Sequence, residues 1–491
     1  MSYLNVKLIN LLAGRPVGII HKEYADNSSI HPGERIIIKK GKKEINAVVD
    51  TARGLLDKGE IIVSEEVNDL LDLKNGEEVK VSLAPQPKTR NLRQKELMGE
   101  KLDRKELKTI MDDVVKNNLT ETEIAYFVSG ILKEGMTLKE TADMTKAMVE
   151  TGDKLNPKGK IFDKHSIGGI PGRTSPIIVS ICSAAGLHIP KTSSRAITSP
   201  AGTADCMETI CKVDFSLKEI KKIFEKNGSF LVWGGSLNLA PADDDIIKAE
   251  KVLGLDPTPQ LLASVLSKHL AVGADYVLIH IPYGKNAKVN KREAKKLEKK
   301  FKKISKHFNL EIECLLLKTE EPYGEGVGPT LEMKDTIKVL RNESSCNNLK
   351  ERSLKIAAKI LESGGKAKKG KGREKAKKIL ESGKALKYFK KMIKAQKGKI
   401  RNLDLLEEAK YNEAIKSSQS GKIKEINIKK INSLARVAGC PLDEKAGLYL
   451  HKHLGEEVKK GEEVATIYAE SKSELKQAID YYREEEPVRI E

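Results

Sequence analysis

The chain has 491 residues, of which 39% are hydrophobic and 32% charged. This length predicts about three domains, and the composition excludes a largely disordered chain. No apolar run is long enough to cross a membrane, and Met1–Pro16 lacks the residue order of a signal peptide, so we expect a cytoplasmic protein without a membrane partner.

The net charge of +19 fits either a polyanionic partner or a small anionic substrate. Lysines are interleaved with glutamates, as in Lys296–Lys303 and Glu457–Glu463, which is typical of solvated helix faces. The basic runs carry no aromatic pattern for base stacking. We therefore expect no nucleic-acid partner.

The six cysteines are spread along the chain without a Cys-x-x-Cys pair. The closest two, Cys206 and Cys211, have no flanking His or Cys at zinc spacing, and the nine histidines show no metal-binding pattern. We predict reduced structural thiols and no metal site.

Composition and periodicity divide the chain into five regions. Residues 1–84 are β-rich, with strands expected at Glu34–Lys39, Glu44–Asp50, Gly59–Val63 and Glu78–Leu83, and a proline-rich boundary follows. Residues 88–160 are helical, with capping boxes beginning at Thr120 and Thr137, and later helices are candidates for the same domain.

The three remaining regions are less uniform. Residues 161–345 predict a central α/β domain. Its apolar runs fit either strands or helices, and they are Pro176–Ala185, Tyr276–Ile281 and Leu310–Leu317. The segment Lys288–Lys306 predicts a basic surface helix. Residues 346–420 predict a helical connector. Residues 421–491 are β-rich, and the Gly-x-x-Val repeats at Gly455 and Gly461 are typical of a barrel-sandwich hairpin. No lysine is set at a hairpin tip as in a lipoyl or biotinyl carrier, so a packing or assembly domain is the simpler interpretation.

The segment Asp163–Ser175 combines cations, hydroxyls and three glycines in one loop. Glycines let backbone N–H groups approach an anion, and Ser and Thr add further donors. It matches neither a Walker A loop nor Gly-x-Gly-x-x-Gly. The chemistry favours phosphate binding over an ordinary turn.

A second segment, Thr192–Thr203, carries six hydroxyl residues and one arginine. Alone it would be interpreted as a solvated loop. Because one apolar run separates it from the first segment, a shared oxyanion site becomes more plausible.

A third segment runs from Leu255 to Lys268. Asp256 stands before a proline at a loop-to-helix boundary, where a carboxylate near the N-cap is the simpler interpretation. Ser264 and Lys268 share a helix face because they are four residues apart.

Taken together, and in this order along the chain, these segments resemble the thymidine and pyrimidine-nucleoside phosphorylase superfamily. The resemblance covers residues from about 90 to the end. It rests on Asp163-Lys-His-Ser-x-Gly-Gly, Thr174-Ser175, Ser193-x-Arg195, Gly202-Thr203, Ser264-x-x-Ser-Lys268 and Ala446-Gly-Leu-Tyr-Leu-His-Lys.

The additional N-terminal β domain, the full second segment and Gly284-Lys-Asn-Ala-Lys288 resemble the archaeal AMP phosphorylase branch. The nucleoside branch has His-Thr-Gly-Gly in place of Ser199-Pro-Ala-Gly202, a base-reading Arg in place of Ala249, and Gly-Ser-Gly-Ala in place of Gly284-Lys-Asn-Ala287. These departures fit a nucleoside 5′-monophosphate and put thymidine as a substrate in doubt.

The resemblance implies a multidomain α/β fold. A small N-terminal β domain is followed by an all-helical domain that faces a central α/β domain across a cleft, and a C-terminal α+β barrel-sandwich domain follows. The terminal domains would support a homo-oligomer.

The implied reaction is AMP + phosphate ⇌ adenine + ribose 1,5-bisphosphate, with no cofactor or metal, in nucleotide salvage that feeds a RuBisCO. CMP and UMP are further candidate substrates. Asp256 would protonate the leaving base. Phosphate would be held by Lys164, Ser166, Thr174, Ser175, Ser193 and Thr203. AMP would be held by Gly168, Ser194, Arg195, Ala196, Ile197, Thr198, Ser199, Thr203, Ser264 and Lys288, with Lys288 and Arg195 as candidates for the 5′-phosphate.

Three alternatives remain. A pyrimidine-nucleoside phosphorylase would act on thymidine or uridine and would not need Lys288. An RNA-binding module would show steeply salt-dependent binding, but no RNA-recognition motif is present. A purely structural protein would not explain two hydroxyl-rich glycine loops.

Overall fold

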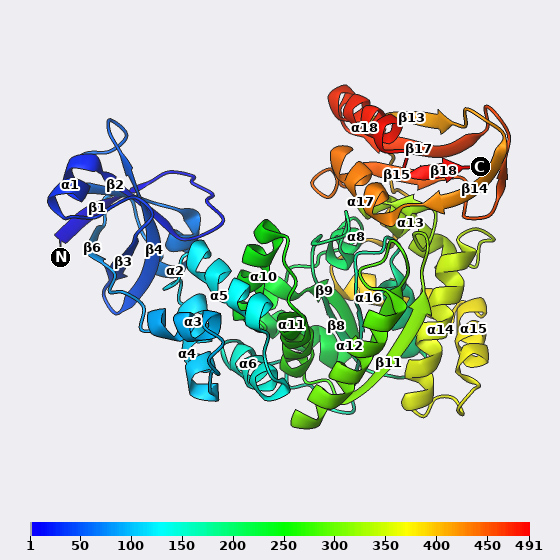
Figure 1. The fold of residues 1–491 in the computed structure, drawn as a ribbon, viewed down its shortest axis with the longest axis horizontal. Helices are drawn as coiled ribbons and strands as arrows, with labels where there is room; N and C mark the ends of the chain where they lie inside the picture. Colours follow the sequence, from blue (N-terminus) through cyan, green and yellow to red (C-terminus); the bar gives the residue numbers. More distant parts are fainter. Residues whose placement is uncertain (1) are drawn as a thin grey trace. The chain divides into compact units, whose positions relative to one another are not determined.

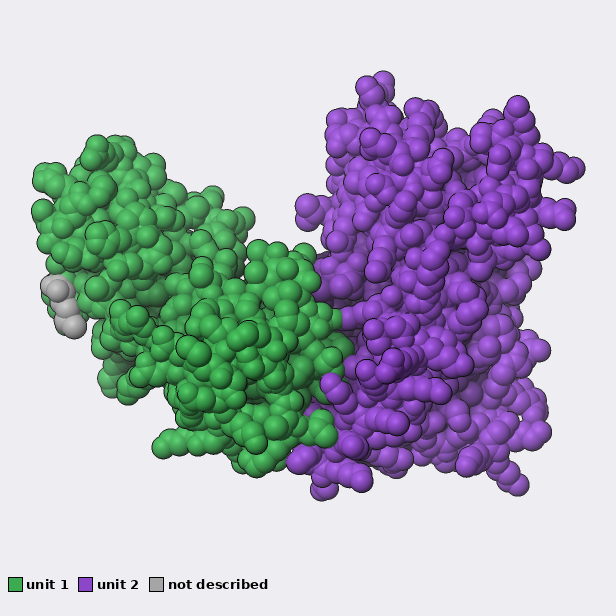
Figure 2. All heavy atoms as spheres, in the orientation of Figure 1, with its two compact units in different colours: residues 1–151, 240–264 green, residues 152–239, 265–491 purple. Residues whose placement is uncertain are grey.

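The computed structural model describes residues 2–491 and divides into two compact units (Figures 1 and 2). Unit 1 contains the chain up to residue 151 together with residues 240–264, and unit 2 contains residues 152–239 and 265–491. No helix within the described residues is both long and apolar enough to span a bilayer.

The first part of unit 1 is a closed six-stranded barrel with the strand order β1-β5-β2-β4-β3-β6. The four strands expected from the sequence are present as β3 to β6. The barrel elements are β1 (Ser2–Leu8), β2 (Val17–His21), α1 (Lys22–Asn27), β3 (Arg35–Lys40), β4 (Lys43–Ala52), β5 (Glu60–Val63), α2 (Glu65–Leu71) and β6 (Glu78–Leu83). Alternate residues such as Ile36 and Ile38 point into a core of aliphatic side chains, as the two-residue period of a strand requires.

The second part of unit 1 is a helical bundle. It comprises α3 (Arg90–Leu97), α4 (Arg104–Val115), α5 (Glu121–Glu134), α6 (Leu138–Glu150) and α10 (Pro241–Leu253). Complete capping boxes begin α5 at Thr120 and α6 at Thr137, as expected. The barrel joins the bundle through the Asn46 amide, which donates to Asn118 Oδ1 at 2.6 Å.

Helix α10 lies inside the stretch 161–345 that we assigned to the central domain, yet it belongs to unit 1. Its residues Ala242, Ile246 and Ala249 are buried in the same apolar core as Ile110 and Val128. Helix α10 therefore belongs to unit 1 because it packs against segments that are more than 100 residues away in the sequence. Local periodicity cannot reveal such long-range packing.

The central part of unit 2 contains parallel strands in the orders β11-β10-β7 and β8-β9, linked by a bridge between Ile161 and His188. The strands are β7 (Phe162–Ser166), β8 (Ile189–Ser193), β9 (Ser229–Trp233), β10 (Tyr276–Tyr283) and β11 (Glu311–Lys318). Two of the three ambiguous apolar runs are strands and the first is a helix. Parallel strands that are covered on both faces have continuous apolar sequences without alternation. The sequence therefore could not distinguish strand from helix in these runs.

Helices pack around these strands. They are α7 (Thr174–Ala184), α8 (Thr203–Glu208), α9 (Leu217–Asn227), α11 (Thr258–Val272, which begins in unit 1), α12 (Lys291–Ile304), α13 (Pro329–Leu340), α14 (Asn347–Ser363), α15 (Gly372–Glu381) and α16 (Lys384–Ala395), with short 3-10 turns at Gly234–Leu237, Ser305–His307 and Ile400–Leu403. Six of these helices, α7, α8 and α13 to α16, contribute to one large apolar core. The six cysteines are unpaired and five of them are buried, as expected of structural thiols.

The C-terminal part of unit 2 has two small sheets, ordered β12-β15-β17-β13 and β16-β14-β18. Its elements are β12 (Gly326–Val327), β13 (Tyr411–Lys416), β14 (Gly421–Ile426), α17 (Ile428–Val437), β15 (Gly447–Leu450), β16 (Glu457–Val458), β17 (Glu463–Ala469), α18 (Lys472–Glu485) and β18 (Val488–Ile490). The β structure begins at Tyr411, before the expected boundary at residue 421, because β13 pairs with β17.

Candidate active site

The loops that follow β7, β8 and β10 leave the same edge of the parallel strands, because carboxyl ends of parallel strands lie together. Gly168 has φ +110°, and a Cβ there would lie 3.2 Å from the Lys288 Cβ. A Cβ on Gly169 would lie 2.6 Å from Thr198 Oγ1. A larger residue does not fit at Gly169, and the three loops are in direct contact.

Lys164, on β7, is buried beside the beginning of α7. Its ammonium group donates to Thr174 Oγ1 at 3.2 Å and to Ser175 Oγ at 3.1 Å. The N-cap residue of α7 makes no side-chain cap bond to the first turn. Unsatisfied N–H groups at a helix start attract anions, so the lysine and both hydroxyls lie where a phosphate would be stabilised. The structure thus brings together three of the residues expected to hold phosphate.

Two further cations lie near Lys164. Lys191, on β8, is 3.4 Å from Asp163 Oδ1, and the Arg173 guanidinium donates to Glu332 Oε2 at 2.5 Å. Burial, with additional repulsion from Lys191 and Arg173, lowers the pKa of Lys164 to about 7. An anion bound at Lys164 would restore its proton and its charge.

Two more predicted hydroxyls have different surroundings. Ser166 is exposed at the end of β7 and lies 3.0 Å from Nδ1 of His280. Ser193 ends β8, and its buried Oγ has no hydrogen-bond partner within residues 2–491. A buried hydroxyl without a partner is costly, which favours a ligand oxygen as its partner.

The hydroxyl-rich loop 194–203 is shaped by Asp205, whose Oδ2 accepts from the N–H groups of Ala196 at 2.8 Å and Gly202 at 2.7 Å. Ser199 Oγ donates to the Ala201 carbonyl at 2.6 Å. Ser194 and Thr198 are exposed, and Thr203 begins α8. This leaves Ser194 and Thr198 as accessible hydroxyls of the loop.

Arg195 is held by carboxylates. Its guanidinium is ion-paired with Glu208 and lies 3.3 Å from Asp205 Oδ1, and it stacks 4.9 Å from the Trp233 ring centroid. These ion pairs weaken Arg195 as a candidate for the 5′-phosphate. Lys288, the other candidate, is exposed in the loop after β10.

Asp256 and Ser264 belong to unit 1, whereas the other predicted site residues belong to unit 2. Asp256 is exposed and comes before α11. Ser264 lies on α11, and its hydroxyl donates to Asp243 Oδ2 at 2.9 Å.

Sequence reasoning missed several residues of this region. Lys191 was detectable only as the cation that directly precedes the hydroxyl-rich segment Thr192–Thr203. Glu332, Glu425, Asn432 and Arg436 had no local signal, because each contacts a loop that is more than 100 residues away.

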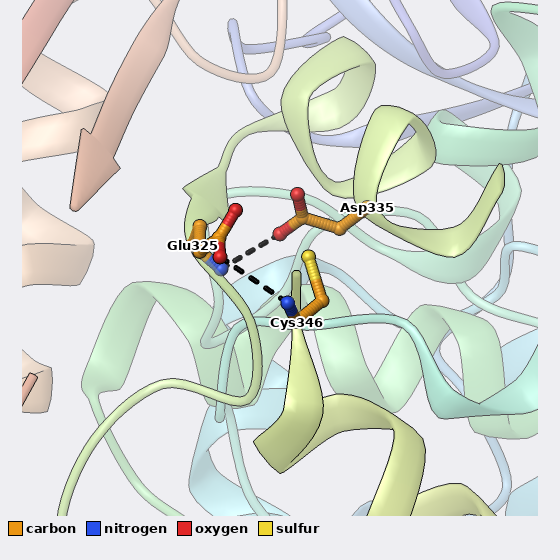
Figure 3. A group of neighbouring side chains, drawn as sticks. All are labelled: Glu325, Asp335 and Cys346. Carbon is orange, nitrogen blue, oxygen red and sulfur yellow. Dashed lines mark hydrogen bonds between the residues drawn. The ribbon is translucent and has the colours of Figure 1, made fainter. Parts of the chain in front are cut away.

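Glu325, Asp335 and Cys346 form a cluster with potential metal-ligating atoms (Figure 3). Asp335 Oδ2 accepts from the N–H groups of Glu325 and Gly326, each at 2.7 Å. The Lys338 ammonium lies 3.4 Å from Glu325 Oε2 and 3.8 Å from Asp335 Oδ1. This lysine already compensates the negative charge, so the cluster is explained as an internal hydrogen-bonded network that joins β12, α13 and α14.

A separate cavity of about 970 Å³ lies against α16, and none of the predicted site residues lines it. Six lysines and one arginine line it: Lys384, Lys387, Lys390, Lys391, Lys394, Lys399 and Arg401. No acidic side chain among the described residues lines this cavity.

Known protein families match most of the chain. The helical bundle domain of a glycosyl transferase family matches residues 90–152, the a/b domain of that family matches residues 158–386, and the pyrimidine nucleoside phosphorylase C-terminal domain matches residues 422–488. These matches confirm the resemblance to the phosphorylase superfamily and the coarse order of helical, α/β and C-terminal domains.

Curated relatives match over the full length. An AMP phosphorylase of Thermococcus kodakarensis is 42% identical over 99% of this chain and 97% of the relative. Those of Pyrococcus furiosus and Methanococcus vannielii are 42% and 39% identical, over at least 99% of this chain and 97% of each relative. The chain belongs to the AMP phosphorylase family.

The fold of this AMP phosphorylase family member also resembles a solved structure. The anthranilate phosphoribosyltransferase of Thermus thermophilus superposes with a TM-score of 0.52 at 17% identity, over 62% of this chain and 99% of that one. This likeness concerns the fold alone.

Proposed function

We infer that this chain is an enzyme that phosphorolyses AMP to adenine and ribose 1,5-bisphosphate. The observation that carries the inference is the full-length similarity to curated AMP phosphorylases, at about 40% identity. The buried cation and hydroxyls at the start of α7 support it, because they suit inorganic phosphate.

In the proposed reaction a phosphate oxygen attacks C1′ of AMP while the C1′–N9 bond breaks and its electron pair goes to adenine. Lys164, Thr174 and Ser175 would hold the phosphate, with Ser166, Ser193 and Thr203 completing its hydrogen bonds. Catalysis would rest on positioning and on charge stabilisation in a site shielded from water, since water would compete with phosphate as nucleophile.

AMP would be bound by the loops after β7, β8 and β10. Gly168 and residues Ser194–Ser199, with Thr203, would contact the nucleotide, and Ser264 would add a hydroxyl from α11. Lys288 is the proposed partner of the 5′-phosphate, because it is an exposed cation in the loop that contacts Gly168.

Asp256 is the proposed general acid, which would transfer a proton to a ring nitrogen of adenine as the base leaves. Asp256→Asn should abolish turnover while AMP binding is largely retained. Near-normal turnover of this variant would refute the assignment.

The first test measures phosphate-dependent release of base from AMP, CMP, UMP, adenosine and thymidine in parallel. Release from the monophosphates, with ribose 1,5-bisphosphate as co-product, supports the proposal. Activity on thymidine or uridine alone would indicate a pyrimidine-nucleoside phosphorylase and would remove the role of Lys288, which the Lys288→Ala variant would check. Steeply salt-dependent binding of long RNA without any phosphorolysis would favour the RNA-binding alternative.

We also propose that the protein acts in the cytoplasm as a homo-oligomer in nucleotide salvage, with the N-terminal barrel and a C-terminal barrel-sandwich domain promoting assembly. Light scattering of the full chain and of a chain that begins at residue 85 would test the assembly role. A monomeric full-length protein would contradict it.

A further inference from the structure

Helix α17 is held by two apolar cores at once. Ile431, Leu434 and Ala435 are buried in the core of the C-terminal sheets, whereas Ile428 belongs to the central α/β core. Asn427 caps the helix by accepting from the N–H groups of Lys429 and Lys430. The helix is therefore a fixed support, and its polar side chains have defined directions.

Asn432 extends from this helix to the glycine loop. Its Nδ2 donates to the Gly169 carbonyl at 2.8 Å, and the residue is only 9% exposed. Gly169 is the residue at which the glycine loop touches Thr198, so this bond fixes the contact point of the two loops.

Arg436 follows Asn432 by one helical turn and lies on the same face. Its Nη2 donates to the carbonyls of Ile197 at 2.7 Å and Ser199 at 3.2 Å. Because a trans peptide places N–H opposite C=O, the bond to Ile197 directs the Thr198 N–H away from α17. One guanidinium thus fixes the backbone on both sides of Thr198.

The third loop is held by β14 of the same domain. Glu425 Oε1 accepts from Lys285 Nζ at 3.0 Å and from Asn286 Nδ2 at 3.1 Å. These two residues lie in the loop that carries Lys288. Each of the three loops in contact therefore has a polar partner from the segment 425–436.

We propose that Asn432, Arg436 and Glu425 are positioning residues for the phosphorolysis reaction, and that the C-terminal domain sets the conformation of the substrate loops in addition to any role in assembly. The proposal rests on the proposed function. None of the three residues is placed against a substrate, so each acts through the backbone or side chains of a loop. A shift of about 1 Å in such a loop can reduce the rate about 100-fold.

The experiment compares substitutions on α17 with neighbouring controls. The test variants are Asn432→Ala, Arg436→Gln and Arg436→Lys, with Glu425→Ala for the third loop. The controls are Ser433→Ala and Lys429→Gln, since both residues are exposed on the same helix. Steady-state kinetics give kcat and the KM values for AMP and phosphate, hydrogen–deuterium exchange reports on residues 194–200, and thermal unfolding gives Tm.

We expect Arg436→Gln to lower kcat/KM for AMP about 10- to 100-fold, chiefly through KM for AMP, with a Tm close to that of the wild type. Amide exchange in residues 194–200 should become faster. Arg436→Lys should restore only part of the affinity, because an ammonium group lacks the planar fork of a guanidinium. Asn432→Ala should raise the KM values of both substrates, and Glu425→Ala should affect AMP alone.

The proposal would be overturned if the Arg436 and Asn432 variants kept wild-type kinetics for AMP, wild-type amide exchange in residues 194–200 and an unchanged Tm. Equal losses in the Ser433→Ala and Lys429→Gln controls would do the same, because the effect would then be general destabilisation. If the wild type does not phosphorolyse AMP, the proposed function fails, yet faster exchange at 194–200 in Arg436→Gln would still support the positioning of that loop.

Discussion

Two groups of cations in unit 2 differ in burial and in their counter-ions. Lys164, Lys191 and Arg173 are buried, and Lys191 pairs with Asp163 while Arg173 pairs with Glu332. The seven cations around the α16 cavity are in contact with solvent, and none forms an ion pair within residues 2–491. Buried charges interact strongly because little water screens them, whereas exposed charges are weakened by solvent and salt. The smaller group, not the larger one, is therefore expected to control phosphate chemistry.

The largest expected effect comes from breaking the buried ion pair. Arg173→Met leaves Glu332 buried without its cation, which should lower the free energy of unfolding by about 3 to 5 kcal/mol. The double variant Arg173→Met/Glu332→Gln should recover part of this loss. As a surface comparison, Lys302→Met removes an exposed pair with Glu298 and should cost only about 0.3 to 0.5 kcal/mol. Chemical denaturation measures all three values, and equal costs for the buried and surface substitutions would contradict the comparison.

Lys164→Met tests the buried group through activity. It removes the ammonium that donates to Thr174 and Ser175, so kcat/KM for phosphate should fall about 100- to 1000-fold. The protein should remain folded, since methionine is accommodated in a buried position more easily than a charge. A fall of less than tenfold in phosphorolysis kinetics would show that Lys164 does not hold the phosphate.

The pH dependence follows from the pKa of Lys164, which burial lowers to about 7 from an ordinary 10.5. Between pH 7 and 10.5 the Lys164 side chain of the free site is mostly neutral. It must take up a proton before it can bind phosphate as an ammonium cation. The KM for phosphate should therefore rise between pH 8 and 9.5, by up to about tenfold per pH unit. Calorimetry in buffers of different ionisation enthalpy should detect the proton uptake, and a flat profile would contradict it.

The same pKa shift affects stability with a defined sign. Between pH 7 and 10.5 the unfolded chain keeps the Lys164 proton that the folded chain has released. This group therefore makes the free energy of unfolding rise with pH in that window. Lys164→Met should lack this contribution, which denaturation at several pH values would show.

The smallest effect is expected at the α16 cavity. Replacing Lys387, Lys391 and Lys394 together by glutamine should leave kcat unchanged and alter the stability by about 0.5 kcal/mol per site or less. Any change should be confined to the salt dependence of KM. A tenfold loss of kcat in the triple variant would overturn the contrast between the two groups.

The sequence predicted those features that depend on neighbouring residues. The barrel strands β3 to β6 followed from alternation and turn residues, and the capping boxes of α5 and α6 followed from Thr-x-x-Glu spacing. The glycine loop and its hydroxyls also lie in one short stretch, so their contact with Lys164 could be anticipated.

Long-range partners could not be predicted in this way. Glu332 and Arg436 occupy ordinary helix positions, and only folding brings them to Arg173 and to the loop around Thr198. The assignment of Pro176–Ala185 stayed open for a different reason, since a fully buried segment loses the alternation that separates strand from helix.

The discontinuity of unit 1 has a consequence for the order of folding during synthesis. The barrel is encoded by residues before 84 and can close as soon as these have left the ribosome. The bundle core, by contrast, requires Ala242, Ile246 and Ala249 of α10, which follow α6 by roughly 90 residues. At a synthesis rate of about 5 to 20 residues per second, the apolar faces of α4 and α5 remain without that helix for about 5 to 25 s. During this interval they are exposed to chaperones and to other nascent chains, and the capping boxes at Asp103 and Thr120 are local interactions that favour these two helices before their core is complete.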